Sequence, residues 1–326
     1  MKVLMGQGLA RKYGERIEKL GYQVLSYDEK NPNEKSDYGE DILIGAIDLK
    51  KINYKDHKNL KYIFLTSVGI DFLDLGYIKE KEITLSNNNG AYDDPIAEWI
   101  VYGLLQINKD DRRNIENQKE KLWKKRSFAY NLYGKKALFM GTGTIAVAGA
   151  KRLKGFEIEL NGFNTSGRKV EPFDNVYSLE ELDRILPEMD YLIMCLPETE
   201  KTHYILNADR FKRLKDGVVV VNISRGSTID EYALVDAIKS GKVRGAALVD
   251  AIKSGKVRGA ALDVFEEEPL SKDSELWELE NVYLYPHISF ACEDLGARQF
   301  ATAYQNLKAL KNAGDFKNIV DFDKGY

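Results

Sequence analysis

The sequence predicts an α/β fold of two domains, each built on a parallel sheet. The chain has 326 residues, which indicates two domains at roughly 150 residues each. Short apolar runs alternate with helical segments in two series, and one long helical stretch separates the series. Strands that alternate with helices are typical of βαβ units, whose strands form parallel sheets.

The first series lies in the N-terminal part of the chain. Short buried strands are predicted at residues 2–5, 42–47, 62–65 and 83–86, with helical segments such as Gly14 to Leu20 between them. Pro95 then opens the long helical stretch, which continues to Asp111. Proline is tolerated at that point because its missing N–H group is not needed in the first turn of a helix.

The second series begins after residue 135. Strands are predicted at residues 137–140, 157–163, 191–196 and 218–223, with a helix between each strand and the next. The two series on either side of the long helix predict two α/β domains.

The composition excludes several classes of protein. Hydrophobic residues make up 44% and charged residues 30% of the chain, a mix typical of globular rather than disordered or fibrous proteins. The net charge of −3 gives no field that favours nucleic acid or acidic membranes, and no apolar run is long enough for a membrane span. The chain shows no secretory leader and only two cysteines, Cys195 and Cys292, so we expect a cytoplasmic protein without a disulfide framework.

One segment of the chain is duplicated. Residues 233–246 (ALVDAIKSGKVRGA) recur without a change as residues 247–260. The unit is a helix, a glycine stop and a strand, and nothing else shares its period, so this is a tandem duplication for which we expect no designed function. Because residues 257–262 run directly into Asp263, we expect the second copy to form the native strand. The extra residues would then extend the helix, loop out or pair with another subunit.

A glycine turn follows the first strand of the second series. Gly141, Gly143 and Ala146 fit the pattern GxGxx[GA], and a helix of small residues follows. Gly141 permits a tight turn, Gly143 lets the backbone approach a pyrophosphate, and Ala146 allows close packing of helix and strand. The helix N-terminus at Thr144 and Ile145 would direct N–H groups and the positive end of its dipole towards the anion. The turn predicts a dinucleotide site; a glycine turn without a ligand is the alternative.

The segment after the next strand bears on the choice of cofactor. A site for NAD usually has Asp or Glu about 20 residues after the glycines, where it accepts from the ribose 2′-OH. Asn164 stands there without a charge, Thr165 and Ser166 offer donors, and Arg168 and Lys169 can pair with a 2′-phosphate. We therefore expect NADP to be favoured over NAD; a solvated basic loop beside bound NAD is the alternative.

The three histidines of the chain differ in their surroundings. His57 lies in a charged run that predicts a solvated face, and His203 follows a turn and is expected to be exposed. His287 follows an apolar strand and Pro286, at a place where the strand ends of an α/β sheet line a crevice. His287 is therefore the candidate acid or base; a satisfied core histidine is the alternative.

Other strand ends supply charged partners for an imidazole and a substrate. Asp263 and Glu268 follow one strand, and a carboxylate beside an imidazole favours the protonated ring and fixes its tautomer. Arg225 ends a valine-rich strand, where a substrate carboxylate would give bidentate pairing. Taken alone, Arg225 could also form a structural ion pair. Taken alone, Glu268 could also belong to a solvated acidic run. Together these residues indicate acid–base chemistry beside a dinucleotide, and we expect no metal site because the histidines and cysteines are scattered.

At these residues the sequence resembles the D-isomer-specific 2-hydroxyacid dehydrogenases over nearly its whole length. Besides the glycine turn, the resemblance rests on residues 65–71, 95–98, 196–202, 207–211, 214–217, 222–226, 261–269 and 286–287.

The resemblance implies hydride transfer between NAD(P)H and C2 of a 2-oxo acid, in a homodimer. Arg225 would orient the 2-oxo acid, His287 would be the acid or base, and Glu268 would be its partner. Asp263 would face the nicotinamide carboxamide. The cofactor groove would be lined by Leu196, Pro197, Thr202, Ile223 and Ser224.

The resemblance also implies two domains that are Rossmann-like or flavodoxin-like. A discontinuous substrate domain would comprise residues 1–94 and 286–326, and the cofactor domain, residues 95–285 with the duplication, would be inserted between them. Backbone N–H groups around Val68 and Gly69 would hold the substrate carboxylate.

Two other classes of function compete with this interpretation. One is a dinucleotide-binding regulatory protein of the same fold with weak or no turnover. The other is a different enzyme on the same architecture, such as a formate dehydrogenase or a hydrolase with a Rossmann domain. The intact set of Arg225, Glu268 and His287 favours the dehydrogenase, and hydrolysis would need an activated nucleophile or metal cluster that the sequence does not offer.

Overall fold

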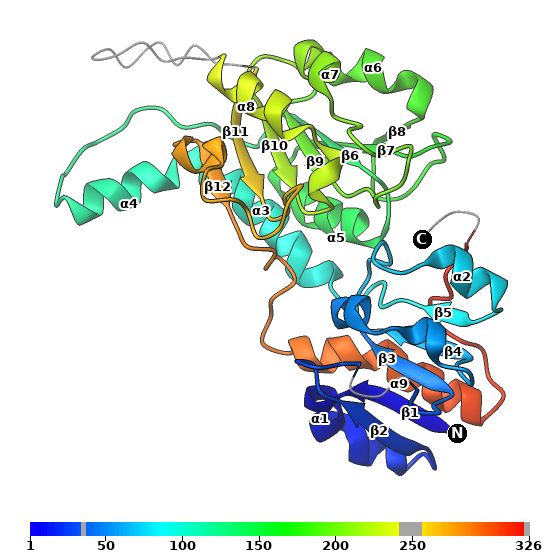
Figure 1. Cartoon of the computed structure of the whole chain (residues 1–326). Coiled ribbons are helices and arrows are strands. Elements are labelled where there is room, and N and C mark those ends of the chain that lie inside the picture. Colours follow the sequence, from blue (N-terminus) through cyan, green and yellow to red (C-terminus); the bar gives the residue numbers. More distant parts are fainter. Residues whose placement is uncertain (34–36, 241–255, 323–326) are drawn as a thin grey trace. The chain divides into compact units, whose positions relative to one another are not determined.

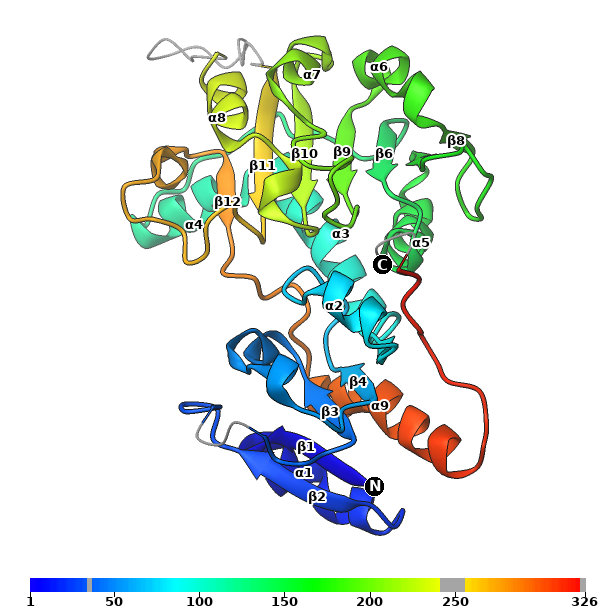
Figure 2. The same ribbon diagram turned by 45° about the vertical axis from the view of Figure 1, so that its right-hand side comes forward.

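The computed structural model describes residues 1–33, 37–240 and 256–322. The chain divides into two compact units, of which unit 1 comprises Met1–Ala91 and Cys292–Tyr326 and unit 2 comprises Tyr92–Ala291. Each unit is a parallel sheet with helices on both faces (Figures 1 and 2), which confirms the predicted α/β fold class. No helix in the described ranges is long and apolar enough to cross a membrane.

Unit 1 is built on five parallel strands among its described residues, in the order β2-β1-β3-β4-β5. This order is that of the flavodoxin-like doubly wound sheet, which places binding sites outside the carboxyl ends of the strands. The strands are β1 (Lys2–Gly6), β2 (Gln23–Tyr27), β3 (Ile42–Gly45), β4 (Tyr62–Leu65) and β5 (Thr84–Ser86).

The helices of unit 1 cover both faces of this sheet because its strands are apolar on both faces. α1 (Gln7–Glu18) and α9 (Leu295–Lys311) share one core, in which the rings of Tyr13 and Phe300 stack with centroids 4.2 Å apart. α2 (Leu75–Glu80) packs on the other face through Ile78. α9 therefore joins the N-terminal strands although it lies near the other end of the chain (Figure 1).

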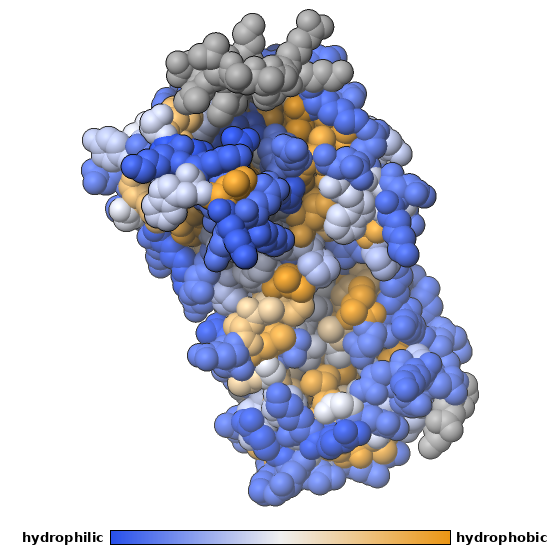
Figure 3. Space-filling model, turned by 90° about the vertical axis from the view of Figure 1, so that its left-hand side faces the viewer, coloured by the Kyte–Doolittle hydropathy of each residue, from blue (hydrophilic) through white to orange (hydrophobic). Residues whose placement is uncertain are grey.

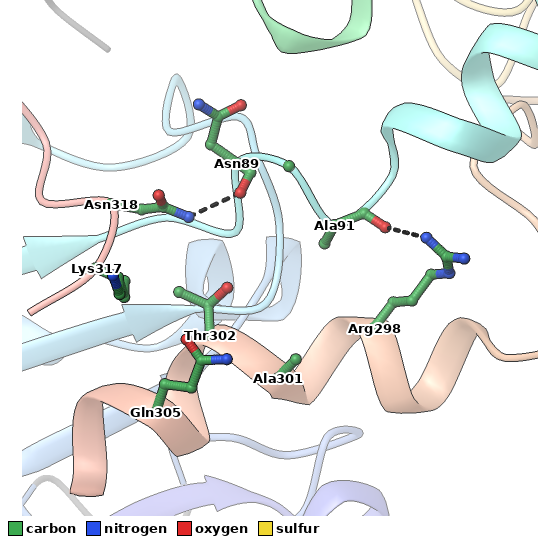
Figure 4. Close-up of a pocket in the computed structure, with 9 residues that line it drawn as sticks. Asn89, Ala91, Arg298, Ala301, Thr302, Gln305, Lys317 and Asn318 are labelled. Atoms are coloured by element: carbon green, nitrogen blue, oxygen red, sulfur yellow. Dashed lines mark hydrogen bonds between the residues drawn. The ribbon is translucent and has the colours of Figure 1, made fainter. Parts of the chain in front are cut away.

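A cavity of about 350 Å³ lies in unit 1 between the segment after β5 and the start of α9 (Figure 4). Among the hydrogen bonds that fasten this segment, Asn318 Nδ2 donates to the carbonyl oxygen of Asn89 over 2.8 Å, and Arg298 Nη1 donates to that of Ala91 over 3.3 Å. None of the site residues predicted from the sequence lines this cavity.

Unit 2 is built on seven parallel strands among its described residues, in the order β12-β11-β10-β9-β6-β7-β8. The order reverses between β6 and β9, and a dinucleotide binds at such a switch point in open α/β sheets. The strands are β6 (Lys136–Met140), β7 (Glu159–Phe163), β8 (Asn175–Tyr177), β9 (Tyr191–Met194), β10 (Val218–Asn222), β11 (Val257–Leu262) and β12 (Val282–Leu284).

Two cores sandwich the sheet of unit 2. Along β10, Val218 and Val220 face one core, and Val219 and Val221 face the other, as the alternation of side chains along a strand requires. α3 (Asp93–Lys109) and α5 (Thr144–Leu153) cover one face, and α6 (Leu182–Ile185), α7 (Ala208–Arg213) and α8 (Glu231–Lys239) cover the other.

The long helix predicted from Pro95 to Asp111 is α3, which begins at Asp93 and ends at Lys109. It ends because Asp110 adopts a left-handed conformation with φ of 50°, after which α4 (Asp111–Lys119) begins. α3 lies directly on the sheet, since a Cβ added at Gly103 would lie 2.9 Å from that of Ala261.

The structure takes the helix from one copy of the duplicated segment and the strand from the other. α8 contains residues 233–239 of the first copy, and β11, Val257–Leu262, begins in the second copy. The expectation that the second copy forms the native strand is therefore confirmed. The path of the extra residues between them lies outside the described ranges.

The sequence-based strand predictions missed two edge strands, β2 and β8. The two strands lie at the outer end of their sheets, so each has only one strand neighbour, and neither is fully buried along its length. Their runs are mixed in polarity for this reason, and the apolar pattern that marks a central parallel strand is missing.

Candidate active site

The glycine turn lies between β6 and α5, at the carboxyl edge of the sheet of unit 2. Gly141 has a φ of 110°, and a Cβ there would lie 2.7 Å from the carbonyl oxygen of Cys195. Only glycine fits both the left-handed conformation and this approach of the next strand. The turn is thus held against the end of β9, on the other side of the switch point.

The start of α5 offers room for an anion. A Cβ added at Gly143 would meet no described atom within 4 Å, so the backbone is open to an approaching group. Ala146 is fully buried against the sheet, and the Thr144 hydroxyl donates to Asp93 over 3.0 Å. Ile145 occupies the first turn, whose N–H groups and dipole favour a phosphate. These features fit a pyrophosphate.

Asn164 organises the loop after β7 and joins it to the glycine turn. Its Nδ2 donates to the Thr142 hydroxyl over 3.1 Å and to the Arg168 carbonyl over 2.8 Å. Its Oδ1 accepts from the N–H groups of Ser166 and Arg168. The Asn164 amide is therefore occupied within the loop, and its uncharged side chain has a structural reason.

The same loop presents cations to solvent. Arg168 and Lys169 are exposed, and neither forms an ion pair with any residue that the structure describes. Thr165 and Ser166 are also exposed beside them. The Ser166 hydroxyl donates to Asn164 Oδ1 over 3.4 Å, so the loop has two positive charges and the Thr165 hydroxyl available to a ligand at the end of β7.

The predicted lining of the cofactor groove divides between two strand ends. Leu196 and Pro197 follow β9, where the Thr202 hydroxyl donates to the Pro197 carbonyl over 2.6 Å and closes the turn. Ile223 and Ser224 follow β10, and Ser224 is buried with its hydroxyl donating to Asn222 over 2.9 Å. The Ser224 hydroxyl is therefore used within the protein.

Arg225 is fixed through its backbone. Its carbonyl oxygen accepts from Asn222 Nδ2 over 3.0 Å and from the Thr228 hydroxyl over 2.7 Å, and its Nη1 donates to the Ser224 carbonyl. Both donors are buried. Sequence reasoning missed Asn222 and Thr228; the signal was a polar residue that ends an otherwise all-valine buried strand.

The structure brings Glu268 and His287 together. Nδ1 of His287 lies 2.9 Å from Oε2 of Glu268, and Oε1 of Glu268 accepts from the Phe265 N–H over 3.1 Å. The two side chains are 43% and 37% exposed, so the pair is open to a substrate rather than sealed in the core. With Nδ1 engaged by the carboxylate, Nε2 of the ring is left to face a reacting group.

Asp263 holds the segment that carries His287. Its carboxylate accepts from the N–H groups of Ile288 over 2.7 Å and Ser289 over 2.9 Å, and its carbonyl oxygen accepts from the His287 N–H. Burial raises the pKa of the Asp263 carboxyl, although the hydrogen bonds from Ser289 and Ile288 oppose the shift. This structural role was not predicted from the sequence.

Register places the charged residues at one edge of the sheet. Asn222, Leu262 and Leu284 lie side by side on β10, β11 and β12, and the chain reaches Arg225, Asp263 and His287 within three residues of them. His287 has a φ of 55°, which is unusual for a residue other than glycine and is often found at functional sites.

Val68 and Gly69 belong to unit 1, where they follow β4 at the carboxyl edge of that sheet. The Val68 carbonyl accepts from Asn87 Nδ2 over 3.1 Å. Neither the Val68 nor the Gly69 N–H donates to a residue in the described part of the chain. These N–H groups are therefore available to a ligand.

The other two histidines lie outside this site. His203 is half exposed, as expected, and pairs with Glu198 over 2.9 Å. The prediction of a solvated face for His57 is wrong: the ring is buried, and its Nδ1 contacts the buried carboxylate of Glu40. The charged sequence around His57 gives no indication that Glu40, far from it in the sequence, buries its ring. Among the described residues, no group of three His, Cys, Asp or Glu side chains is arranged to hold a metal ion.

Comparison with a family model shows which known proteins share these features. The model described as "D-isomer specific 2-hydroxyacid dehydrogenase, NAD binding domain" matches residues 101–248 and 245–289. The two matched segments meet within the duplicated region, as expected for one domain that carries an insertion.

Known relatives extend the similarity beyond that domain. A hydroxypyruvate reductase of Thermotoga maritima is 33% identical over 71% of this chain and 71% of its own. A glyoxylate reductase of Pyrococcus horikoshii is 30% identical over 83% of this chain and 76% of its own. The crystal structure of a D-isomer specific 2-hydroxyacid dehydrogenase family protein from Aeromonas salmonicida is 28% identical, with a TM-score of 0.82 and 99% of both chains covered.

Proposed function

Since this chain belongs to the D-isomer specific 2-hydroxyacid dehydrogenase family, we propose that it reduces a 2-oxo acid to the D-2-hydroxy acid with NAD(P)H, and catalyses the reverse reaction. The observation that carries the proposal is the contact between Glu268 and His287, at the edge of the sheet that also holds the glycine turn. The named relatives are reductases, which gives no support to the alternative of a regulatory protein without turnover.

His287 is proposed as the proton donor of the reduction. When bound, a reduced nicotinamide supplies the hydride that C2 of the 2-oxo acid receives. His287 then gives a proton to the carbonyl oxygen as that oxygen becomes a hydroxyl, and in the reverse direction it accepts the hydroxyl proton. Glu268 holds the ring through Nδ1 and so fixes its orientation and tautomer.

Arg225 is proposed to orient the substrate. Its backbone is fixed by Asn222 and Thr228, so the guanidinium projects from a rigid strand end. A planar guanidinium pairs with a carboxylate through two parallel hydrogen bonds. We propose that the guanidinium of Arg225 holds the 2-oxo acid in this way and that the N–H groups of Val68 and Gly69 also bind the substrate carboxylate.

We propose a cofactor domain and a substrate domain whose boundaries lie close to those of the two compact units, with Arg225 of the cofactor domain also contacting the substrate. We propose that residues 95–285 bind the cofactor and that residues 1–94 and 286–326 bind the substrate. The compact units break at Ala91 and Ala291, a few residues from these boundaries, and the unit with the glycine turn also carries His287.

We propose that NADP is favoured over NAD. Support comes from the exposed cations Arg168 and Lys169 in the loop that Asn164 organises, since the uncharged Asn164 rather than a carboxylate directly follows β7. Gly141, Gly143, Thr144, Ile145, Thr165 and Ser166 are proposed to contact the dinucleotide, with Leu196, Pro197, Thr202, Ile223, Ser224 and Asp263 along the groove.

A homodimer is proposed from the surface around α4. Trp123 is 91% exposed, and Phe128 and Tyr133 are more than half exposed. Aromatic residues are enriched in protein interfaces, and Figure 3 shows apolar patches among hydrophilic residues on the side that carries α4. Light scattering should give a dimer for the wild type and a smaller mass for Trp123→Asp; a monomeric wild type would contradict the proposal.

We also propose a cytoplasmic setting, since Cys195 and Cys292 are free thiols.

Initial rates with glyoxylate, hydroxypyruvate and 2-ketogluconate, each with NADPH and NADH, test the proposed function. We expect turnover of at least one of these acids, with a lower KM for NADPH than for NADH. Cofactor binding without turnover of any 2-oxo acid would contradict the proposal.

A further inference from the structure

The segment after β11 that carries Glu268 is fastened to the first turn of α8. Oε1 of Glu231 accepts the backbone N–H of Glu266 over 2.6 Å. Glu231 follows Asp230, which caps α8 by accepting from the Ala233 N–H, so its place on the helix is well defined. The contact therefore connects a rigid helix end to the backbone two residues before Glu268.

Two further contacts hold the same segment. The Tyr204 hydroxyl donates to the carboxylate of Glu266, and the Phe265 N–H donates to Oε1 of Glu268. The Glu268 carboxylate is 37% exposed, so packing alone does not fix it. The orientation of the Glu268 carboxylate towards His287 therefore depends on the backbone of residues 265–268. It depends in turn on the contacts that Glu231 and Tyr204 make with Glu266.

Burial and neighbouring acidic groups oppose the charged form of Glu231, and the contact with Glu266 favours it. Burial raises the pKa of the Glu231 carboxyl, the hydrogen bond from the Glu266 N–H lowers it, and the charges of Glu266 and Glu268 raise it. Asp230 and Glu231 also act on Tyr204, whose pKa is raised to about 12, first by its hydrogen bond to Glu266. A carboxyl kept at such a place against desolvation and like charges needs a compensating role.

We propose that Glu231 is a positioning residue for the reaction: it holds the backbone at Glu266 so that Glu268 faces His287. This inference rests on the proposed function, because it assigns to Glu231 an effect exerted through the Glu268–His287 pair. Glu231 does not need to touch substrate or cofactor. A small displacement of a group that orients a catalytic side chain lowers turnover far more than it lowers binding.

Replacing Glu231 by residues that keep or remove its acceptor tests this role. Glu231→Met keeps the size of the side chain and removes the acceptor, and Glu231→Ala removes both. We expect either change to lower kcat for 2-oxo acid reduction roughly tenfold while KM and Kd for NADPH stay unchanged. Glu231→Gln keeps an oxygen that accepts the Glu266 N–H, so we expect it to restore most of kcat.

Glu267→Ala is the matched control, because Glu267 is an exposed member of the same acidic run. We expect it to leave kcat unchanged. The inference is overturned if Glu231→Met and Glu231→Ala keep the wild-type kcat, or if Glu231→Gln is as impaired as they are. Loss of NADPH binding in step with kcat would also overturn it, since that marks a general structural role.

His287→Ala separates a failure of this inference from a failure of the proposed function. If His287→Ala keeps its turnover, the proposed chemistry fails, whatever the Glu231 variants do. If His287→Ala loses turnover and Glu231→Met does not, only the role of Glu231 is contradicted.

Discussion

Gly226 lies directly against the backbone of Phe265. A Cβ added at Gly226 would lie 1.8 Å from the carbonyl carbon of Phe265 and 2.2 Å from the N atom of Glu266. Gly226 follows Arg225, and Phe265 lies three residues before Glu268. The approach of these two backbones therefore sets the distance between the strand end that carries Arg225 and the segment that carries Glu268.

Gly226→Ala should disturb this packing. The obstacle is backbone rather than a flexible side chain, so we expect the free energy of unfolding to fall by about 3 kcal/mol. Urea unfolding followed by circular dichroism measures this change. Gly143→Ala is the control, because its Cβ would meet no described atom within 4 Å; its stability should be unchanged while its Kd for NADPH rises. Equal stability of the two variants would contradict this account.

Arg168→Ala should change the cofactor preference. Loss of a charged hydrogen bond to the 2′-phosphate should raise KM for NADPH roughly 10-fold to 100-fold and leave KM for NADH unchanged. Lys154→Ala, an exposed cation at the far end of α5, should change neither value. Equal effects of Arg168→Ala on both cofactors would show that this loop does not contact the 2′ position.

Deletion of residues 247–260 should leave a folded and active protein. After the deletion, residues 243–246 precede Ala261, so the chain keeps the β11 sequence VRGAAL and the same helix in α8. Shortening the connection changes the free energy of unfolding by about 1 kcal/mol or less, since loop entropy varies slowly with length. We expect kcat to be at least that of the full chain. A loss of soluble, folded protein would mean that the extra residues are needed.

The pH dependence of stability should change in Glu231→Gln. The folded protein raises the pKa of Glu231, chiefly by burial, above its value in the unfolded chain. The unfolded state therefore releases the Glu231 proton first as pH rises. The stability that Glu231 contributes is fully present below the ordinary Glu pKa and is lost as pH passes through the raised pKa. Glutamine does not titrate. We expect the Tm of Glu231→Gln to rise relative to that of the wild type as pH increases above the ordinary Glu pKa; a difference in Tm that does not change with pH would contradict the raised pKa.

Several elements could be predicted from the sequence because local pattern alone decides them. β4 occupies residues 62–65 as predicted, since a buried parallel strand is a continuous apolar run. The strand formed by the second copy of the duplication follows from covalent continuity with Asp263. The glycine turn was recognisable because both its glycines and the strand and helix around it are local features.

Other features depend on contacts between distant residues and leave no local pattern. The buried ring of His57 pairs with Glu40, which is distant in the sequence. The hydrogen bond from the Glu266 N–H to Glu231 joins the segment after β11 to α8. The left-handed backbone of His287 is likewise imposed by its surroundings, including the hydrogen bond of its N–H to Asp263. The sequence therefore indicated candidate site residues but not the contacts that hold them in place.

The most direct test of the central claim is the turnover of His287→Ala, measured together with its affinity for NADPH. Loss of the proton donor should lower kcat for 2-oxo acid reduction by about 10²-fold to 10⁴-fold. The Kd for NADPH, followed by fluorescence, should stay near the wild-type value because the glycine turn is untouched. Wild-type turnover in this variant would contradict the assignment of His287 as the acid.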